Sequence, residues 1–153
     1  MLLLLCTFFV IFGFSSQDGE TSGNVSRKVA KKIVDFFPST RGCSEEAKQN
    51  IVEDIQPIVR KSAHFSIYMV VGILMMTFMS TFSLNLIRKI FISVIVGIIY
   101  ASSDEIHQSF IPDRTPAITD VIIDTAGVMI GIFIVILIVM IATKREKKRG
   151  NNL

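Results

Sequence analysis

The chain has 153 residues, of which half are hydrophobic and 19% are charged, and the two kinds separate into long apolar runs and short charged segments, unlike the mixed sequence of a soluble domain. The net charge of +3 comes from residues 144–149, which hold five of the 16 cations and one of the 13 acidic residues, so it gives no evidence of a nucleic-acid-binding surface. Cys6 and Cys43 form neither a disulfide framework nor a metal-binding spacing, and we assign no metal ligand and name no cofactor.

The first apolar run covers residues 2–14. It is shorter than the roughly 20 residues that span a hydrocarbon core. No basic segment precedes it and no cleavage site of the small-x-small kind follows, so a signal peptide is disfavoured. We therefore predict a transmembrane helix here.

The segment 15–62 contains two amphipathic stretches. The first ends at Pro38, and the second starts at Ser44, a suitable N-cap, and has Pro57 as a bend or break. Such helices lie along a membrane surface or cap a bundle. Their apolar stripes are Val25, Val29, Ile33 and Phe36 in the first, and Ala47, Ile51, Ile55 and Ile58 in the second.

Three further apolar runs predict transmembrane helices at residues 63–82, 87–103 and 118–142. The run at residues 87–103 extends as helix through residues 104–108. None has the alternation of a membrane β-strand. The predicted fold is therefore all-α, with about four transmembrane helices and surface helices in one domain, 1–143, followed by a basic tail, 144–153.

Cations in short connections predict the orientation in the membrane. Arg88 and Lys89 lie between the second and third runs, and the basic tail follows the fourth, so both belong in the cytoplasm. The N- and C-termini are then cytoplasmic, and segments 15–62 and 104–117 face outward. Eight Lys or Arg residues in segment 15–62 oppose this assignment.

Polar side chains recur at helical spacing near the outward ends of three predicted helices, and Arg114 lies in a loop stiffened by Pro112 and Pro116. Acidic side chains at membrane depth need partners, so we predict a buried polar cluster that binds a ligand. Interfacial anchoring, or acids that merely belong to a loop, would explain each stripe taken alone. The predicted ligand-binding residues are Lys61, His64, Tyr68, Asp104, Glu105, His107, Gln108, Arg114, Asp120 and Asp124.

The sequence resembles the VanZ-like family of small bacterial membrane proteins, named for a member associated with teicoplanin resistance. The resemblance rests on Phe14-Ser15-Ser16-Gln17, Lys61-x-x-His64-x-x-x-Tyr68, Asp104-Glu105-x-His107-Gln108-x-Phe110, Pro112-x-Arg114 and Asp120-x-x-x-Asp124-x-x-Gly127-x-x-x-Gly131, in this order.

The resemblance implies four membrane helices in the plasma membrane of Gram-positive-type bacteria, and a role in the cell envelope. It supplies no reaction. The chain departs from the family at two positions, with Asp113 where the family often has Gly and Asp124 where it often has Asn. The second departure puts in doubt any role that depends on a neutral amide at that position.

Three functions fit these observations. The first is an envelope factor that lowers glycopeptide susceptibility by binding a lipid-linked ligand, with membrane lipid, an envelope precursor or a lipoglycopeptide as partner and no nucleic acid. The second is an enzyme acting on a lipid-linked cell-wall or teichoic-acid precursor, in which the acids would bind a divalent metal or shuttle protons. The third is a structural or assembly partner. We lean against catalysis, for which the candidate residues are His107, Asp104, Glu105 and His64.

Overall fold

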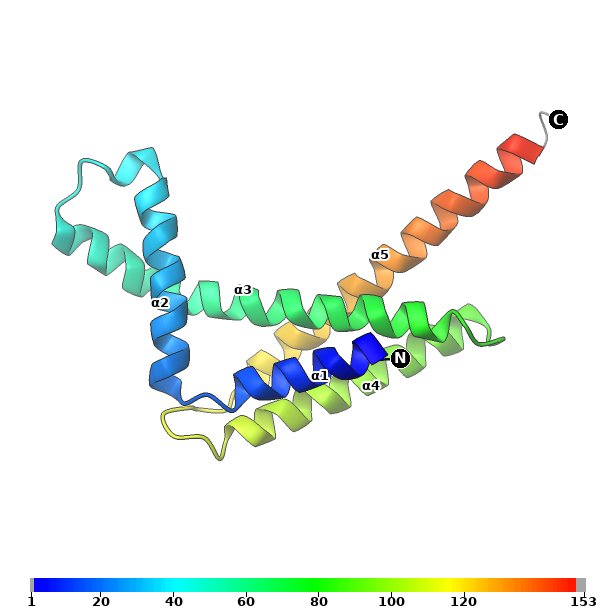
Figure 1. The fold of residues 1–153 in the computed structure, drawn as a ribbon, viewed down its shortest axis with the longest axis horizontal. Helices are drawn as coiled ribbons and strands as arrows, with labels where there is room; N and C mark the ends of the chain where they lie inside the picture. Colours follow the sequence, from blue (N-terminus) through cyan, green and yellow to red (C-terminus); the bar gives the residue numbers. More distant parts are fainter. Residues whose placement is uncertain (1, 151–153) are drawn as a thin grey trace.

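The computed structural model describes residues 2–150, and this part of the chain is helical throughout with short connections (Figure 1). The predicted all-α fold is confirmed. The elements are α1 (Leu2–Ser15), α2 (Gly19–Phe36), the short 3₁₀ turn η1 (Pro38–Thr40), α3 (Glu45–Met79), α4 (Leu86–Gln108) and α5 (Ile118–Gly150).

Within the described residues, α3, α4 and α5 are each long and apolar enough to cross a membrane. The first run is different, because α1 has 14 residues and so a length of ~21 Å, against a hydrocarbon core of ~30 Å. It qualifies as a fourth span only together with α2, from which it is bent by 104°. The structure therefore holds three candidate spans, or four if the bent pair counts as one.

The second amphipathic stretch and the second apolar run form a single helix. We predicted a bend or break at Pro57 and a transmembrane helix to residue 82. Helix α3 continues through Pro57 without a break and ends at Met79. Ser44 caps its N-terminus as predicted, since its side chain accepts a hydrogen bond from the Ala47 amide. One continuous helix thus carries side chains from the outer segment into the bundle.

Helix α2 packs against the first half of α3 and stands away from the bundle (Figure 1). The face it buries contains Ala30 and Val34, which contact Val52 of α3. The predicted apolar stripe, which includes Val25 and Phe36, lies outside this face and is exposed. An exposed apolar stripe on an outer helix is suited to contact with lipid.

The closest helix pair is α3 with α5, and small residues permit it. A Cβ atom on Gly127 or Gly131 would overlap the backbone carbonyl of Phe65 or Met69, respectively. The surface formed by Gly127 and Gly131, a small-xxx-small pattern, therefore contacts the backbone of α3 directly. This contact fixes the register between the polar ends of the two helices.

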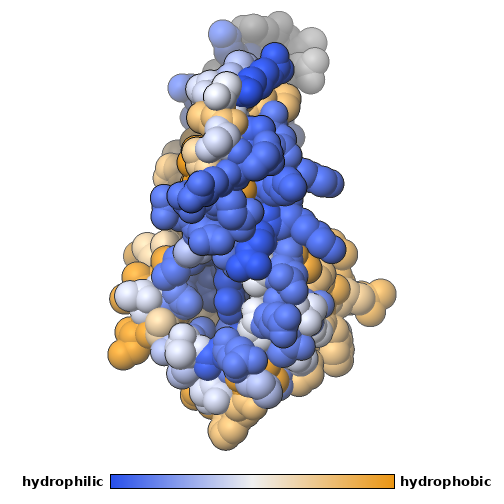
Figure 2. Space-filling view, turned by 90° about the vertical axis from the view of Figure 1, so that its left-hand side faces the viewer, coloured by the Kyte–Doolittle hydropathy of each residue, from blue (hydrophilic) through white to orange (hydrophobic). Residues whose placement is uncertain are grey.

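The basic tail does not leave the helix. Helix α5 runs to Gly150, and residues 151–153 of the predicted tail lie outside the described residues. Its C-terminal half separates from α3 and α4, on the same side of the molecule as the α3–α4 turn (Figure 1). At the opposite end, hydrophilic residues cover the middle of the face and apolar residues flank it (Figure 2).

Candidate functional site

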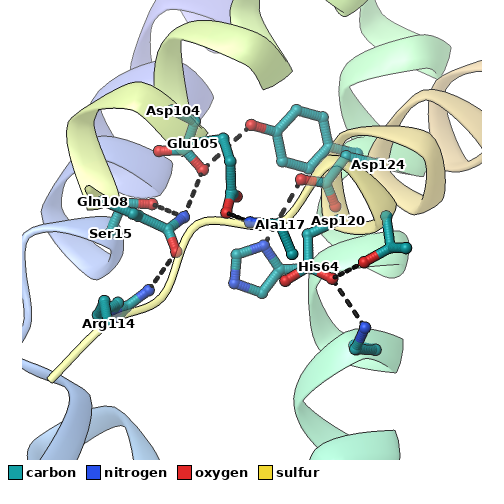
Figure 3. A network of polar contacts seen from close by, with 12 residues as sticks. Ser15, His64, Asp104, Glu105, Gln108, Arg114, Ala117, Asp120 and Asp124 are labelled. Atoms are coloured by element: carbon teal, nitrogen blue, oxygen red, sulfur yellow. Dashed lines mark hydrogen bonds and ion pairs between the residues drawn. The ribbon is translucent and has the colours of Figure 1, made fainter.

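Side chains from α3, α4 and α5 meet near the loop that joins α4 to α5, as the polar stripes predicted (Figure 3). Tyr68, Asp104 and Asp124 are almost completely buried there. Buried polar groups of this kind require hydrogen-bond or ionic partners. The structure supplies them through three separate sets of contacts.

The first set links α3 to the α4–α5 loop. The Tyr68 hydroxyl donates to Asp104 Oδ2 at 3.2 Å, and Gln108 Nε2 donates to the same oxygen at 3.1 Å. Gln108 Oε1 in turn accepts from Arg114 Nη1 at 2.7 Å. Asp104 is therefore held from two sides, and the position of Arg114 depends on that of Asp104.

Arg114 also fastens the loop to the α1–α2 turn. Its Nε donates to the Gln17 carbonyl at 3.1 Å, and its Nη2 reaches the Phe14 carbonyl at 3.4 Å. Burial, together with the neighbouring guanidinium of Arg60, lowers the pKa of Arg114. With three of its donors so engaged, Arg114 acts chiefly as a clamp between two loops.

The second set involves Glu105, which faces the start of α5. Its Oε1 accepts a hydrogen bond from the Ala117 amide at 2.7 Å, directly before the first residue of α5. The first amides of a helix lack partners within the helix. Glu105 therefore serves as a side-chain cap for α5.

The third set contains two pairs between α3 and α5. Lys61 Nζ lies 2.8 Å from Asp120 Oδ1, and both side chains are partly exposed. One turn deeper, His64 Nδ1 lies 3.7 Å from Asp124 Oδ2. The helix repeat that spaced these residues in the sequence places the two pairs one above the other.

His107 is the one predicted residue that lies apart from the cluster. Its Nε2 is 3.1 Å from Ser16 Oγ, and its ring stacks on Phe12 at a centroid distance of 4.5 Å. Both neighbours belong to α1 and the turn after it. The structure thus places this catalytic candidate at the α1–α4 contact.

Two cavities adjoin the cluster, and they meet at Arg60 and His64. One, of about 300 Å³, lies between α1, α2 and α3 and has a mainly apolar lining that includes Val25, Val29 and Ile67. The other, of about 220 Å³, is polar and is lined by residues such as Lys61, Asp120 and Asp124.

Arg60 is the functional residue that our sequence reasoning missed. It lines both cavities, and Arg114 also lines the apolar one. Arg60 precedes His64 by four residues, so the same helical spacing that selected Lys61 could have found it.

These features define a helical membrane protein with a polar cluster and a partly cationic cavity near one end of its helices. The chain belongs to the VanZ/LLP1 family, whose model matches residues 1–139. The match covers nearly the whole chain and confirms the resemblance seen in its motifs. No curated protein and no solved structure matches the chain.

Proposed function

We propose that this protein binds an anionic, lipid-linked ligand of the cell envelope at the outer face of a bacterial plasma membrane, and thereby lowers susceptibility to teicoplanin-type lipoglycopeptides. The observation that carries the proposal is the junction of an apolar and a polar cavity at Arg60 and His64. The link to glycopeptides rests on membership of the family alone.

The two cavities suit the two parts of such a ligand. An acyl or prenyl chain would lie in the apolar cavity, where side chains such as Ile11 and Val29 line the wall. A phosphate or carboxylate group would reach the polar cavity beside it. Together the cavities amount to about 520 Å³, from 300 and 220 Å³, which is in the range of small-molecule sites.

The charges support an anionic group. Arg60 and Arg114 line the same cavity, and the charge of Arg60 is among the causes that lower the pKa of Arg114. Two guanidinium groups that repel each other gain from an anion between them, and guanidinium pairs well with phosphate or carboxylate. Arg114 is largely occupied as a clamp, so Arg60 is the main cation for the ligand.

A binding measurement on the purified full chain in lipid nanodiscs tests the proposal. A long-chain polyprenyl phosphate should bind, and the uncharged polyprenol of equal length should bind at least roughly tenfold more weakly, which is the loss expected for a charge-assisted hydrogen bond. Arg60→Gln should lower the affinity for the phosphate by a similar factor. Arg88→Gln is the matched control, because Arg88 lies at the N-terminal end of α4, away from the α4–α5 loop. This variant should leave the affinity for the phosphate unchanged.

The cellular role is tested by expression in a susceptible Gram-positive host. The growth-inhibitory concentration of an acylated lipoglycopeptide should rise several-fold, and that of a glycopeptide without the acyl chain should not. Arg60→Gln should abolish the rise at equal membrane abundance. An undiminished rise with Arg60→Gln would contradict the proposed binding mode.

An enzyme acting on a lipid-linked precursor is the second candidate, and the buried His64–Asp124 pair beside the polar cavity favours it. Turnover of such a precursor by the purified protein, lost in Asp124→Asn and retained in His107→Gln, would decide for catalysis.

A further inference from the structure

Three potential metal ligands lie together beside the polar cavity, and two of them, His64 and Asp124, line it. His64, Asp104 and Asp124 each offer one ligand atom, and these atoms lie within 4.8 Å of one another. They come from α3, α4 and α5, so the cluster joins the three helices that are long enough to span a membrane. Figure 3 shows His64 and Asp124 joined by their ion pair, with Asp104 at the upper left of the view.

A second observation points to a missing ligand. Asp124 is 2% exposed, and among the described residues its Oδ1 atom has no hydrogen-bond partner. The Nδ1 atom of His64 has none either, because its 3.7 Å distance to Asp124 Oδ2 is too long for a hydrogen bond. A buried polar atom without a hydrogen-bond partner costs free energy, so Asp124 Oδ1 and His64 Nδ1 each require a further partner.

The charges point in the same direction. Asp104 and Asp124 are both almost completely buried within helices that span the membrane, and the side chains that donate to Asp104, Tyr68 and Gln108, are neutral. Of the described side chains in direct contact with these two carboxylates, only His64 can carry a positive charge. Charged groups at such depth are stable only when they are compensated.

We propose that His64, Asp104 and Asp124 bind a divalent transition-metal ion of the Zn²⁺ or Mn²⁺ type. One imidazole and two carboxylates suit these ions, whereas Mg²⁺ and Ca²⁺ take oxygen ligands. Ligand atoms ~2.1 Å from one ion lie ~3–4 Å apart, so small side-chain rotations would close the present spacing. The bonds from Tyr68 and Gln108 orient Asp104, as outer partners of metal ligands commonly do.

Because His64 and Asp124 line the polar cavity, the ion would be reached from it and would keep open positions toward it. No metal-binding spacing is visible in the sequence, because the three ligands belong to three different helices. The inference goes beyond the proposed binding of a lipid-linked ligand and does not depend on it, since it is tested with no such ligand present.

Metal content of the purified full chain in detergent provides the test. After treatment with a chelator and dialysis against Zn²⁺ or, separately, Mn²⁺, elemental analysis should find a single ion per chain. Asp124→Asn and His64→Gln should weaken its binding at least roughly tenfold. Asp120→Asn and His107→Gln are the matched controls and should retain it, because neither residue belongs to the triad.

X-ray absorption of the Zn²⁺-loaded wild-type protein gives a measurement that does not depend on the folding of variants. The first shell should contain one imidazole nitrogen and otherwise oxygen. Absence of stoichiometric metal from the wild type, retention in Asp124→Asn, or a shell without imidazole would overturn the proposal. The site would then be a buried His–Asp ion pair only.

Discussion

At the scale of single residues, Asp113 gives the sharpest prediction. Its φ of 58° lies in the left-handed region, which explains why the family often has glycine there. Asp113→Gly should leave the free energy of unfolding unchanged or raise it by less than about 1 kcal/mol. Glycine removes the cost of the left-handed conformation, but it also gains entropy in the unfolded chain, which limits the increase. Asp113→Val should lower it by about 1–2 kcal/mol, because a β-branched residue does not tolerate this conformation.

Thermal unfolding in detergent measures both changes. Asp113→Asn is the control for the lost charge and should resemble the wild type, since asparagine also accepts a positive φ. Equal stability of the Val and Gly variants would contradict the argument from backbone conformation.

Helical spacing predicted the residues of the candidate site well where another helix of the bundle covers them. Tyr68 and Asp104, assigned from separate stripes, are joined by a hydrogen bond. Spacing could not tell which neighbour covers each side of α4, and so His107 faces α1 while the adjacent Gln108 faces Arg114. Successive helical residues point about 100° apart, so neighbours in sequence can serve different contacts.

At the scale of helices, the contact between α3 and α5 should control stability. A methyl group at Gly131 would overlap the Met69 carbonyl, so Gly131→Ala must push the two helices apart. We expect a loss of about 1–3 kcal/mol in the free energy of unfolding, the usual cost of overpacking. Gly13→Ala in α1 is the matched control, because a methyl group there meets nothing within 4 Å.

The control should be neutral or slightly stabilising, since alanine favours helix over glycine by about 1 kcal/mol. Thermal unfolding of the two variants in detergent compares them directly. If Gly131→Ala behaved like Gly13→Ala, the close approach of the two backbones would not be needed for stability.

The positions of the helices were predictable from the sequence, but the continuity of α3 and the buried face of α2 were not. Pro57 was expected to bend or break α3, and the helix runs through it without a break, because packing against α2 and α5 stabilises both halves. In α2 the spacing of the larger apolar residues did not reveal that the smaller Ala30 and Val34 pack on α3. In a chain surrounded by lipid, hydrophobicity alone does not distinguish a protein contact from a lipid contact.

At the scale of the whole molecule, the distribution of positive charge indicates how the helices are oriented in the membrane. The start of α4, which carries Arg88 and Lys89, and the basic end of α5 lie on one side of the molecule, and the α4–α5 loop lies on the other (Figure 1). The polar cluster and its polar cavity adjoin that loop. The positive-inside rule therefore predicts that the cluster faces outward. Binding of an extracellular drug or a surface-exposed lipid headgroup requires that orientation.

Cysteine labelling in intact bacteria measures the orientation directly. In a Cys6→Ser, Cys43→Ser background, Thr115→Cys in the α4–α5 loop should react with a membrane-impermeant maleimide. Thr143→Cys, beside the basic end of α5, should react only after permeabilisation. Both threonines are exposed, so a difference between them reports the side of the membrane. The reverse pattern would place the cavities in the cytoplasm, where an extracellular glycopeptide has no access to them.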